Sequence, residues 1–201
     1  AGMKPITLSY KEGLSLLNGT ISPTALAALA VDDAIRAVKT ADVCGAMSLE
    51  GLGGLLRAYD PRVMACRPQR EIKETAENVR AVLKGSGVLE ACKDSHVQDP
   101  LSIRCIPQTH GAAKRILYNA REVVETELNS CADNPIVWGD EDQFEAFSNG
   151  NPDSSYVGLQ MDAACIAAAS VAKMSERRNV RFLDTSLSGH PWFLIKSPGL
   201  N

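Results

Sequence analysis

The fold is decided by residues 22–50, which read SPTALAALAVDDAIRAVKTADVCGAMSLE. Ser22 and Pro23 have the form of a helix N-cap followed by proline at the first helical position, and Gly45 is the one weak point before Glu50. The stretch therefore predicts one helix, roughly 40 Å long at 1.5 Å per residue. Because this exceeds the diameter of a compact domain of this size, the helix needs other long helices beside it.

Three further segments place apolar residues at helical spacing. They are residues 72–83, which end at Gly85-Ser86-Gly87, residues 113–129 and residues 154–177. The last segment is rich in alanine and has almost no polar face, so we expect it to be buried at the centre of a bundle or between subunits. A membrane span is the alternative, but Gln160, Asp162 and Ser170 interrupt the stretch and disfavour it.

Strand character is confined to residues 136–147, where Ile136-Val137-Trp138 and residues 144–147 flank an acidic turn. This pattern predicts a small β-hairpin near residues 135–151. The fold class is therefore all-α, a bundle of long helices with one small hairpin, and we treat residues 1–201 as one helical part.

Composition excludes several classes of protein. The 201 residues are 45% hydrophobic and 22% charged with a formal net charge of −3, which offers no basic patch for nucleic acid. The six cysteines form no CxxC pair and no leader or long apolar run is present, so we expect a cytoplasmic protein with buried, reduced thiols. The three histidines lack the spacing of metal ligands, so no metal site is expected.

Polar residues gather at the ends of the predicted helices, where sites are usually built. The clusters are residues 18–20, residues 98–104 within the connector VQDPLSIRCIPQ (97–108), residues 133–135 and residues 148–151. Taken singly, Asn-Gly and Asp-Asn-Pro are ordinary turn chemistry, and Arg104 alone would be a surface ion-pair partner. Their order and spacing favour a shared site.

That order resembles the aromatic amino acid lyase family, and the histidine ammonia-lyases in particular. The similar segments are KEGLSLLNGT (11–20), the stretch from Asp60-Pro61 to Pro68, residues 97–105, QTHG (108–111), residues 129–137 and SERR (175–178). They cover essentially the whole chain in the family's order. The resemblance implies a bundle of long helices that associates into oligomers, with each site built from more than one subunit.

The resemblance also implies a chemistry. The family eliminates ammonia from histidine, phenylalanine or tyrosine with an electrophilic 4-methylidene-imidazol-5-one ring, made from an internal Ala-Ser-Gly. By resemblance, Asn18 would lie beside the ring as a catalytic and cofactor-binding residue, Gln98 would line the substrate pocket, and Arg104 would grip the substrate carboxylate. The role of Arg104 is chemically sound because a guanidinium matches a carboxylate with two parallel hydrogen bonds.

Several features depart from the family pattern. No Ala-Ser-Gly occurs, so this chain alone cannot make the ring, and it is expected to be inactive by itself. Leu101 stands where the family has a Tyr, and Pro152 where it has an aromatic or similar residue. A leucine cannot transfer a proton, so position 101 has no acid/base role. Residues 1–5 and 197–201 read as interrupted connections, which suggests a central piece without the family's carboxy-terminal part.

Three origins of this chain fit these features. The chain is one product of a split gene, a fragment of a longer lyase, or a related chain that is kept for assembly. The first two predict an ammonia-lyase part, with histidine as the preferred substrate and a complementing chain or segment supplying the ring. The third predicts a non-catalytic helical scaffold that oligomerises through the alanine-rich helix.

Overall fold

The computed structural model describes residues 2–197. The interrupted connections that the sequence predicts at the two chain ends include Ala1 and residues 198–201, which lie outside this range. Contacts divide the chain into two compact units. Unit 1 contains residues 2–32 and 119–162, and unit 2 contains residues 33–118 and 163–197.

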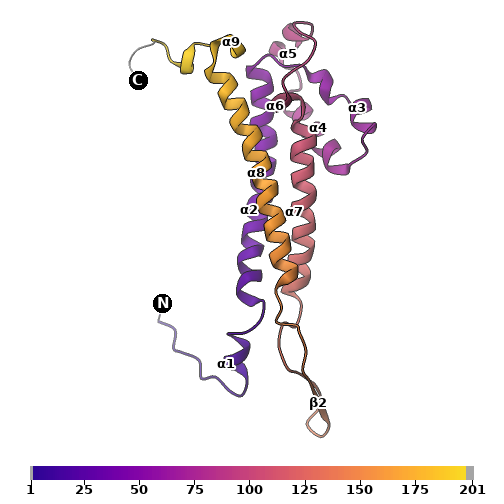
Figure 1. Ribbon diagram of the computed structural model, residues 1–201, viewed down its shortest axis with the longest axis vertical. Coiled ribbons are helices and arrows are strands. Elements are labelled where there is room, and N and C mark those ends of the chain that lie inside the picture. Colours follow the sequence, from indigo (N-terminus) through magenta and orange to yellow (C-terminus); the bar gives the residue numbers. More distant parts are fainter. Residues whose placement is uncertain (1, 198–201) are drawn as a thin grey trace. The chain divides into compact units, whose positions relative to one another are not determined.

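Three long helices dominate the chain (Figure 1). They are α2 (Ile21–Gly51), α7 (Ile106–Leu128) and α8 (Ser155–Leu183), each with residues in both units. Shorter helices are α1 (Glu12–Ser15), α3 (Pro61–Ala65), α4 (Arg70–Val82), α5 (Gly87–Cys92), α6 (Leu101–Arg104) and α9 (Thr185–Ser188), with 3-10 turns at Leu56–Tyr59 and Trp192–Leu194. The predicted helical bundle is confirmed.

The predicted helix boundaries are close but not identical to the observed ones. Helix α2 begins at Ile21, so Ser22 and Pro23 lie in its first turn and Ser22 is not the cap. Proline is tolerated there because the first turn leaves its backbone N–H groups without helical partners. Helix α7 begins seven positions before the predicted residue 113, directly after α6, because Pro107 also sits in a first turn.

The hairpin in unit 1 is confirmed. Strand β1 (Ile136–Gly139) pairs antiparallel with β2 (Phe144–Phe147), and Ile136 faces Phe147 in the register. Gly139 has a φ of +131°, and a Cβ there would lie 2.1 Å from the carbonyl oxygen of Gln143. The turn after β1 therefore requires glycine at this position.

Unit 2 contains a hydrophobic core built from α2, α3, α4, α5, α6, α7 and the 3-10 turn at Leu56–Tyr59. Its buried members are Ala46, Leu49, Tyr59, Met64, Ile72, Ala76, Val79, Leu83, Leu89, Ile103 and Ile106. Helix α7 approaches α4 closely at Gly111, where a Cβ would lie 2.8 Å from the backbone nitrogen of Ile72. This close backbone contact fixes the side chains of α7 relative to α4.

The expectation that the alanine-rich helix is buried is wrong for the described part of this chain. Leu159 and Ile166 of α8 are each 70% exposed. The buried residues of α8 are Val157, Ala167, Val171 and Arg178, which follow one narrow face. Burial between subunits stays a prediction. Helix α8 could cross a membrane by length and composition alone, but core helices of soluble proteins pass the same test.

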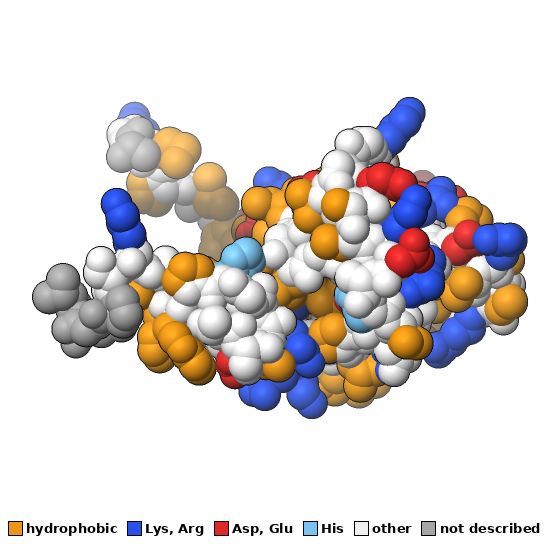
Figure 2. Space-filling model, turned by 90° about the horizontal axis from the view of Figure 1, so that it is seen from above, with side chains coloured by type: hydrophobic (Ala, Val, Ile, Leu, Met, Phe, Trp, Pro, Cys, Tyr) orange, Lys and Arg blue, Asp and Glu red, His pale blue; other side chains and the backbone are white. Residues whose placement is uncertain are grey.

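The expectation for the cysteines is correct in part. All six are free, but Cys44, Cys66, Cys131 and Cys165 are exposed. On the face in Figure 2, hydrophobic side chains lie between positively and negatively charged ones. That face therefore shows no large area of a single charge, in agreement with the mixed composition.

Candidate functional site

The connector that carries Gln98 and Arg104 is more regular than its sequence suggests. Pro100 has an extended backbone and precedes the four-residue helix α6 (Leu101–Arg104). Helix α7 follows after Cys105, with Pro107 as its second residue. Pro100 directly precedes a helix and Pro107 lies in the first turn of one, because proline is tolerated at a helix start and disfavoured in a helix interior.

A buried carboxylate fixes the entrance to this connector. Asp99 accepts a hydrogen bond from the backbone N–H of Leu55 at 2.6 Å and one from Nε2 of His96 at 3.0 Å. Ser95 Oγ lies 2.8 Å from the other ring nitrogen of His96. Gln98 is adjacent to Asp99 in the chain, so its backbone position is set by these contacts.

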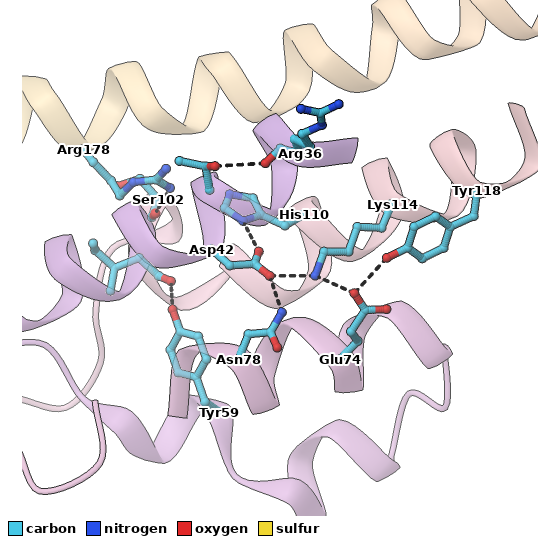
Figure 3. A network of polar contacts seen from close by, with 12 residues as sticks. Arg36, Asp42, Tyr59, Glu74, Asn78, Ser102, His110, Lys114, Tyr118 and Arg178 are labelled. Carbon is cyan, nitrogen blue, oxygen red and sulfur yellow. Dashed lines mark hydrogen bonds and ion pairs between the residues drawn. The ribbon is translucent and has the colours of Figure 1, made fainter. Parts of the chain in front are cut away.

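Two buried donors fix α6 itself. The Tyr59 hydroxyl donates to the carbonyl oxygen of Ile103 at 2.5 Å, and Nη1 of Arg178 donates to the carbonyl oxygen of Ser102 at 3.2 Å. Figure 3 shows both donors pointing toward this short helix. Burial raises the pKa of the Tyr59 hydroxyl, which therefore remains a donor at neutral pH, and burial lowers the pKa of Arg178.

The structure brings Gln98 and Arg104 together in unit 2. Nη1 of Arg104 donates to Oε1 of Gln98. Both side chains line a groove of about 830 Å³ between the connector and α8. The volume lies within the range of about 300–1,000 Å³ that is usual for small-molecule sites.

The groove has a positively charged lining. Besides Gln98 and Arg104, it is formed by Asp99, Pro100, Leu101, Ser102, Lys173, Met174, Arg177, Val180, Arg181 and Leu187. Leu101 is exposed and contributes an apolar surface. The arrangement can hold a carboxylate and an apolar group side by side, but Leu101 can neither give nor take a proton.

Below α6, a buried polar network joins α2, α4 and α7 (Figure 3). Asp42 is 1% exposed and accepts hydrogen bonds from His110 Nδ1 at 2.9 Å, Lys114 Nζ at 2.6 Å and Asn78 Nδ2 at 2.9 Å. Lys114 Nζ also lies 3.1 Å from Glu74 Oε1. Burial alone would raise the pKa of Asp42, but these three hydrogen bonds more than offset it and the pKa is lowered.

Asn18 belongs to unit 1, whereas Gln98 and Arg104 belong to unit 2. Its backbone N–H donates to Leu14 at 2.9 Å, while its side chain is exposed and has no partner among residues 2–197. The next residue, Gly19, has a φ of +109°, and a Cβ there would lie 2.6 Å from the carbonyl oxygen of Ala132. Glycine is therefore required beside Asn18.

The other two polar clusters also meet in unit 1. Oδ1 of Asn134 accepts the backbone N–H of Asn149 at 2.8 Å. Lys11 Nζ contacts the Asp133 carboxylate, and this hydrogen bond holds the pKa of Asp133 below its ordinary value. Three of the four polar clusters thus gather in one unit, and Pro152 follows the last of them. The fourth cluster carries Gln98 and Arg104 in unit 2.

Several of these residues were missed by the sequence interpretation. Tyr59 and Arg178 position the site without lining its groove, and no local pattern distinguishes them from surface residues. Asp99 lies within the predicted cluster 98–104, but its buried role as an acceptor was not predicted. Asp42 did carry a signal, since it interrupts an otherwise apolar part of a helix with an acid. No group of three or more metal-ligating side chains occurs among residues 2–197.

The fold and site define a class: a mainly helical protein with an arginine–glutamine contact at the edge of a groove. The chain belongs to the aromatic amino acid lyase family, whose sequence pattern matches residues 1–201.

The sequences of individual relatives support the assignment of this chain to the family. The histidine ammonia-lyase of Symbiobacterium thermophilum is 39% identical over 200 residues, and that of Streptococcus sanguinis is 40% identical over 201. Each match covers 100% of this chain and 39% of the relative. The chain thus spans about two-fifths of the length of these relatives.

Solved structures of proteins with different activities have the same fold as this chain. Histidine ammonia-lyase from Trypanosoma cruzi has a TM-score of 0.87 at 36% identity, covering 100% of this chain and 37% of that one. Tyrosine aminomutase from Streptomyces globisporus has a TM-score of 0.89 at 33% identity, covering 99% and 41%. Two activities at similar identity mean that overall likeness does not decide the substrate.

Proposed function

We propose that this chain is the central part of an ammonia-lyase subunit that eliminates ammonia from an aromatic amino acid, with L-histidine converted to urocanate as the first candidate. The observation that carries the proposal is the Gln98–Arg104 pair, held over a groove in a chain of this family. The sequence relatives named above are histidine ammonia-lyases, which favours histidine over phenylalanine and tyrosine.

Arg104 is proposed to bind the substrate carboxylate. Its guanidinium is planar and offers parallel N–H donors that match both carboxylate oxygens. Gln98 supports it, because its side-chain oxygen accepts from Nη1 and restricts the rotation of the guanidinium. Fixing the carboxylate in this way orients the amino acid, and such orientation supplies a large part of enzymatic rate enhancement.

Proton transfer must come from residues other than position 101. Leu101 lines the groove but carries no titratable group, so its contribution is to exclude water and contact the apolar part of the substrate. The general acid or base is therefore proposed to lie elsewhere in the complete subunit.

The family's prosthetic ring is compatible with the residues present. Asn18 offers a side-chain amide with no partner among residues 2–197, next to a glycine that fixes its backbone. Such an amide can hydrogen-bond a ring placed beside it. When bound, the 4-methylidene-imidazol-5-one ring supplies an electrophile that no ordinary side chain provides. Because no Ala-Ser-Gly occurs in residues 1–201, the ring is proposed to come from another segment or chain.

The complete enzyme is proposed to be a cytoplasmic oligomer, and the 201 residues alone are proposed to be inactive. The exposed apolar face of α8 supports association, since Leu159 and Ile166 would otherwise remain in water.

The test is an activity assay on the protein in the form that its source cells make, with histidine, phenylalanine and tyrosine supplied separately. Urocanate formation from histidine is expected, and the 201-residue chain alone should form none. If activity is absent, the separately expressed segment that carries Ala-Ser-Gly is added. A mixture that assembles, as native mass spectrometry would show, yet forms neither urocanate nor a cinnamate would contradict the proposal.

A second candidate is a non-catalytic scaffold subunit derived from the family. It is favoured by Leu101, which has no proton-transfer chemistry, together with the exposed apolar face of α8. The same assay separates the two candidates, because a scaffold assembles without producing an unsaturated acid.

A further inference from the structure

Helix α8 presents a row of positive charges to the groove that Gln98 and Arg104 line. Lys173, Arg177 and Arg181 are spaced four residues apart, so they lie on one face of the helix, about 6 Å from each other along its axis. All three contribute to the lining of the groove. With Arg104, the groove has four cationic side chains.

One of the three α8 cations has an ion-pair partner among the described residues. Arg177 bonds to its own neighbour Glu176, while Lys173 and Arg181 form no ion pair with the described residues. Asp99 is the one acidic residue of the lining, and its carboxylate is occupied by Leu55 and His96. Like charges four residues apart destabilise a helix, so this row lowers the stability of α8 while no anion is bound.

The wall of the groove also contains polar atoms without partners. Ser102 is 6% exposed, yet its Oγ has no hydrogen-bond partner among residues 2–197. The Nε atom of Arg104 is likewise buried and unpartnered. Buried polar atoms are rarely left unpaired. These two are covered by protein atoms, as are unpartnered polar atoms elsewhere among the described residues, so the four cations of the lining define the ligand as an anion.

We propose that the groove binds a small molecule with two anionic groups. A carboxylate of this ligand bonds to Arg104, and its second anionic group, a carboxylate or a phosphate-type group, bonds to the row formed by Lys173, Arg177 and Arg181. Because Arg104 also holds the substrate carboxylate in the proposed function, on which this inference rests, the dianion competes with the amino acid. Histidine carries a neutral imidazole where the dianion carries its second anionic group, so bound histidine would leave the cations of α8 without an anion.

The experiment measures binding by calorimetry at low ionic strength, on the protein as its source cells make it. The probes are butyrate with one carboxylate, glutarate with two, and 4-phosphonobutyrate with a carboxylate and a phosphonate. Glutarate or 4-phosphonobutyrate is expected to bind at least about tenfold more tightly than butyrate, and the difference should shrink with added salt. The tighter of the two identifies the second group.

Variants locate the second anionic group. The double variant Lys173→Gln/Arg181→Gln is expected to bind the dianion no better than butyrate, while its affinity for butyrate stays unchanged. Unchanged butyrate binding also shows that the variant is folded. Arg67→Gln removes an exposed cation outside the groove and should change neither affinity. Equal affinities for the three probes, no binding at all, or an equal loss for butyrate and dianion in the double variant would overturn the inference.

Lyase assays on the same preparations separate the two proposals. Activity without a preference for dianions overturns this inference alone. A preference for dianions without ammonia release, even when the segment carrying Ala-Ser-Gly is present, overturns the proposed function alone.

Discussion

The Tyr59 hydroxyl donates a hydrogen bond to the carbonyl oxygen of Ile103 at 2.5 Å, and both residues are fully buried. Tyr59 ends a 3-10 turn that lies 44 positions before Ile103 in the chain. The bond therefore joins the core of unit 2 to the short helix that presents Arg104.

Replacing Tyr59 by phenylalanine tests the strength of this bond. Tyr59→Phe removes one oxygen and leaves the Ile103 carbonyl without that donor, so the free energy of unfolding should fall by about 1–3 kcal/mol. Tyr10→Phe makes the same chemical change at an exposed position and should alter it by less than about 0.5 kcal/mol. Urea denaturation of both variants measures the difference, and equal effects would show that the buried bond contributes nothing.

Two glycines in helices should respond oppositely to alanine. At Gly111 a Cβ would lie 2.8 Å from the backbone nitrogen of Ile72, so Gly111→Ala should push α7 from α4 and lower stability by at least about 1–3 kcal/mol. At Gly158 no atom lies within 4 Å of the added Cβ, and alanine should raise stability by up to about 1 kcal/mol. Thermal unfolding of the two variants gives the signs, and a stabilising Gly111→Ala would contradict the close packing of α7 on α4.

Asp42 should make stability depend on pH in the acid range. Its pKa is lowered from 3.8 in the folded protein, so its stabilising effect is complete above that value and is lost as the pH falls through the lowered pKa. At neutral pH, Asp42→Asn should cost about 3–5 kcal/mol, because His110 and Lys114 lose a buried carboxylate.

The difference between wild type and Asp42→Asn should narrow as the pH falls below about 4. Asp94→Asn, at an exposed position without a partner among the described residues, should match the wild type within about 0.5 kcal/mol at pH 7. Urea denaturation as a function of pH checks both statements. A difference for Asp42→Asn that widens toward acid would mean that the carboxyl is protonated in the folded protein at neutral pH.

Local patterns predicted the elements of this fold well. Apolar spacing and proline or glycine punctuation indicated α2, α4, α7, α8 and the hairpin, because these signals arise within one turn or one pair of strands. Burial was harder to predict. Helix α8 carries apolar residues on almost every side, which predicted that it is buried, yet Leu159 and Ile166 are exposed. Whether an apolar side chain is covered depends on residues that are distant in the sequence or lie in another chain.

The site was predictable to the extent that its residues are close in sequence. Gln98 and Arg104 lie six positions apart, and the structure places them in contact. Arg178 meets Ser102 across 76 positions, and no periodicity in the sequence reports such a pairing. Asn18 is assigned to the site by family resemblance, and its role remains a proposal.

The central claim is that Arg104 holds the carboxylate of the amino acid, and comparing histidine with histamine tests it most directly. The two molecules share an imidazole and an amine, but histamine lacks the carboxylate. In the protein as its source cells make it, histidine should bind at least about tenfold more tightly than histamine, since a hydrogen-bonded charge pair contributes about 1.5–3 kcal/mol.

Arg104→Gln should abolish that preference by weakening histidine binding while leaving histamine unchanged, and Arg67→Gln should retain it. Competition calorimetry on the wild type and the two variants gives the six affinities. If Arg104→Gln keeps the full preference for histidine over histamine, the carboxylate is bound elsewhere and the central claim is wrong.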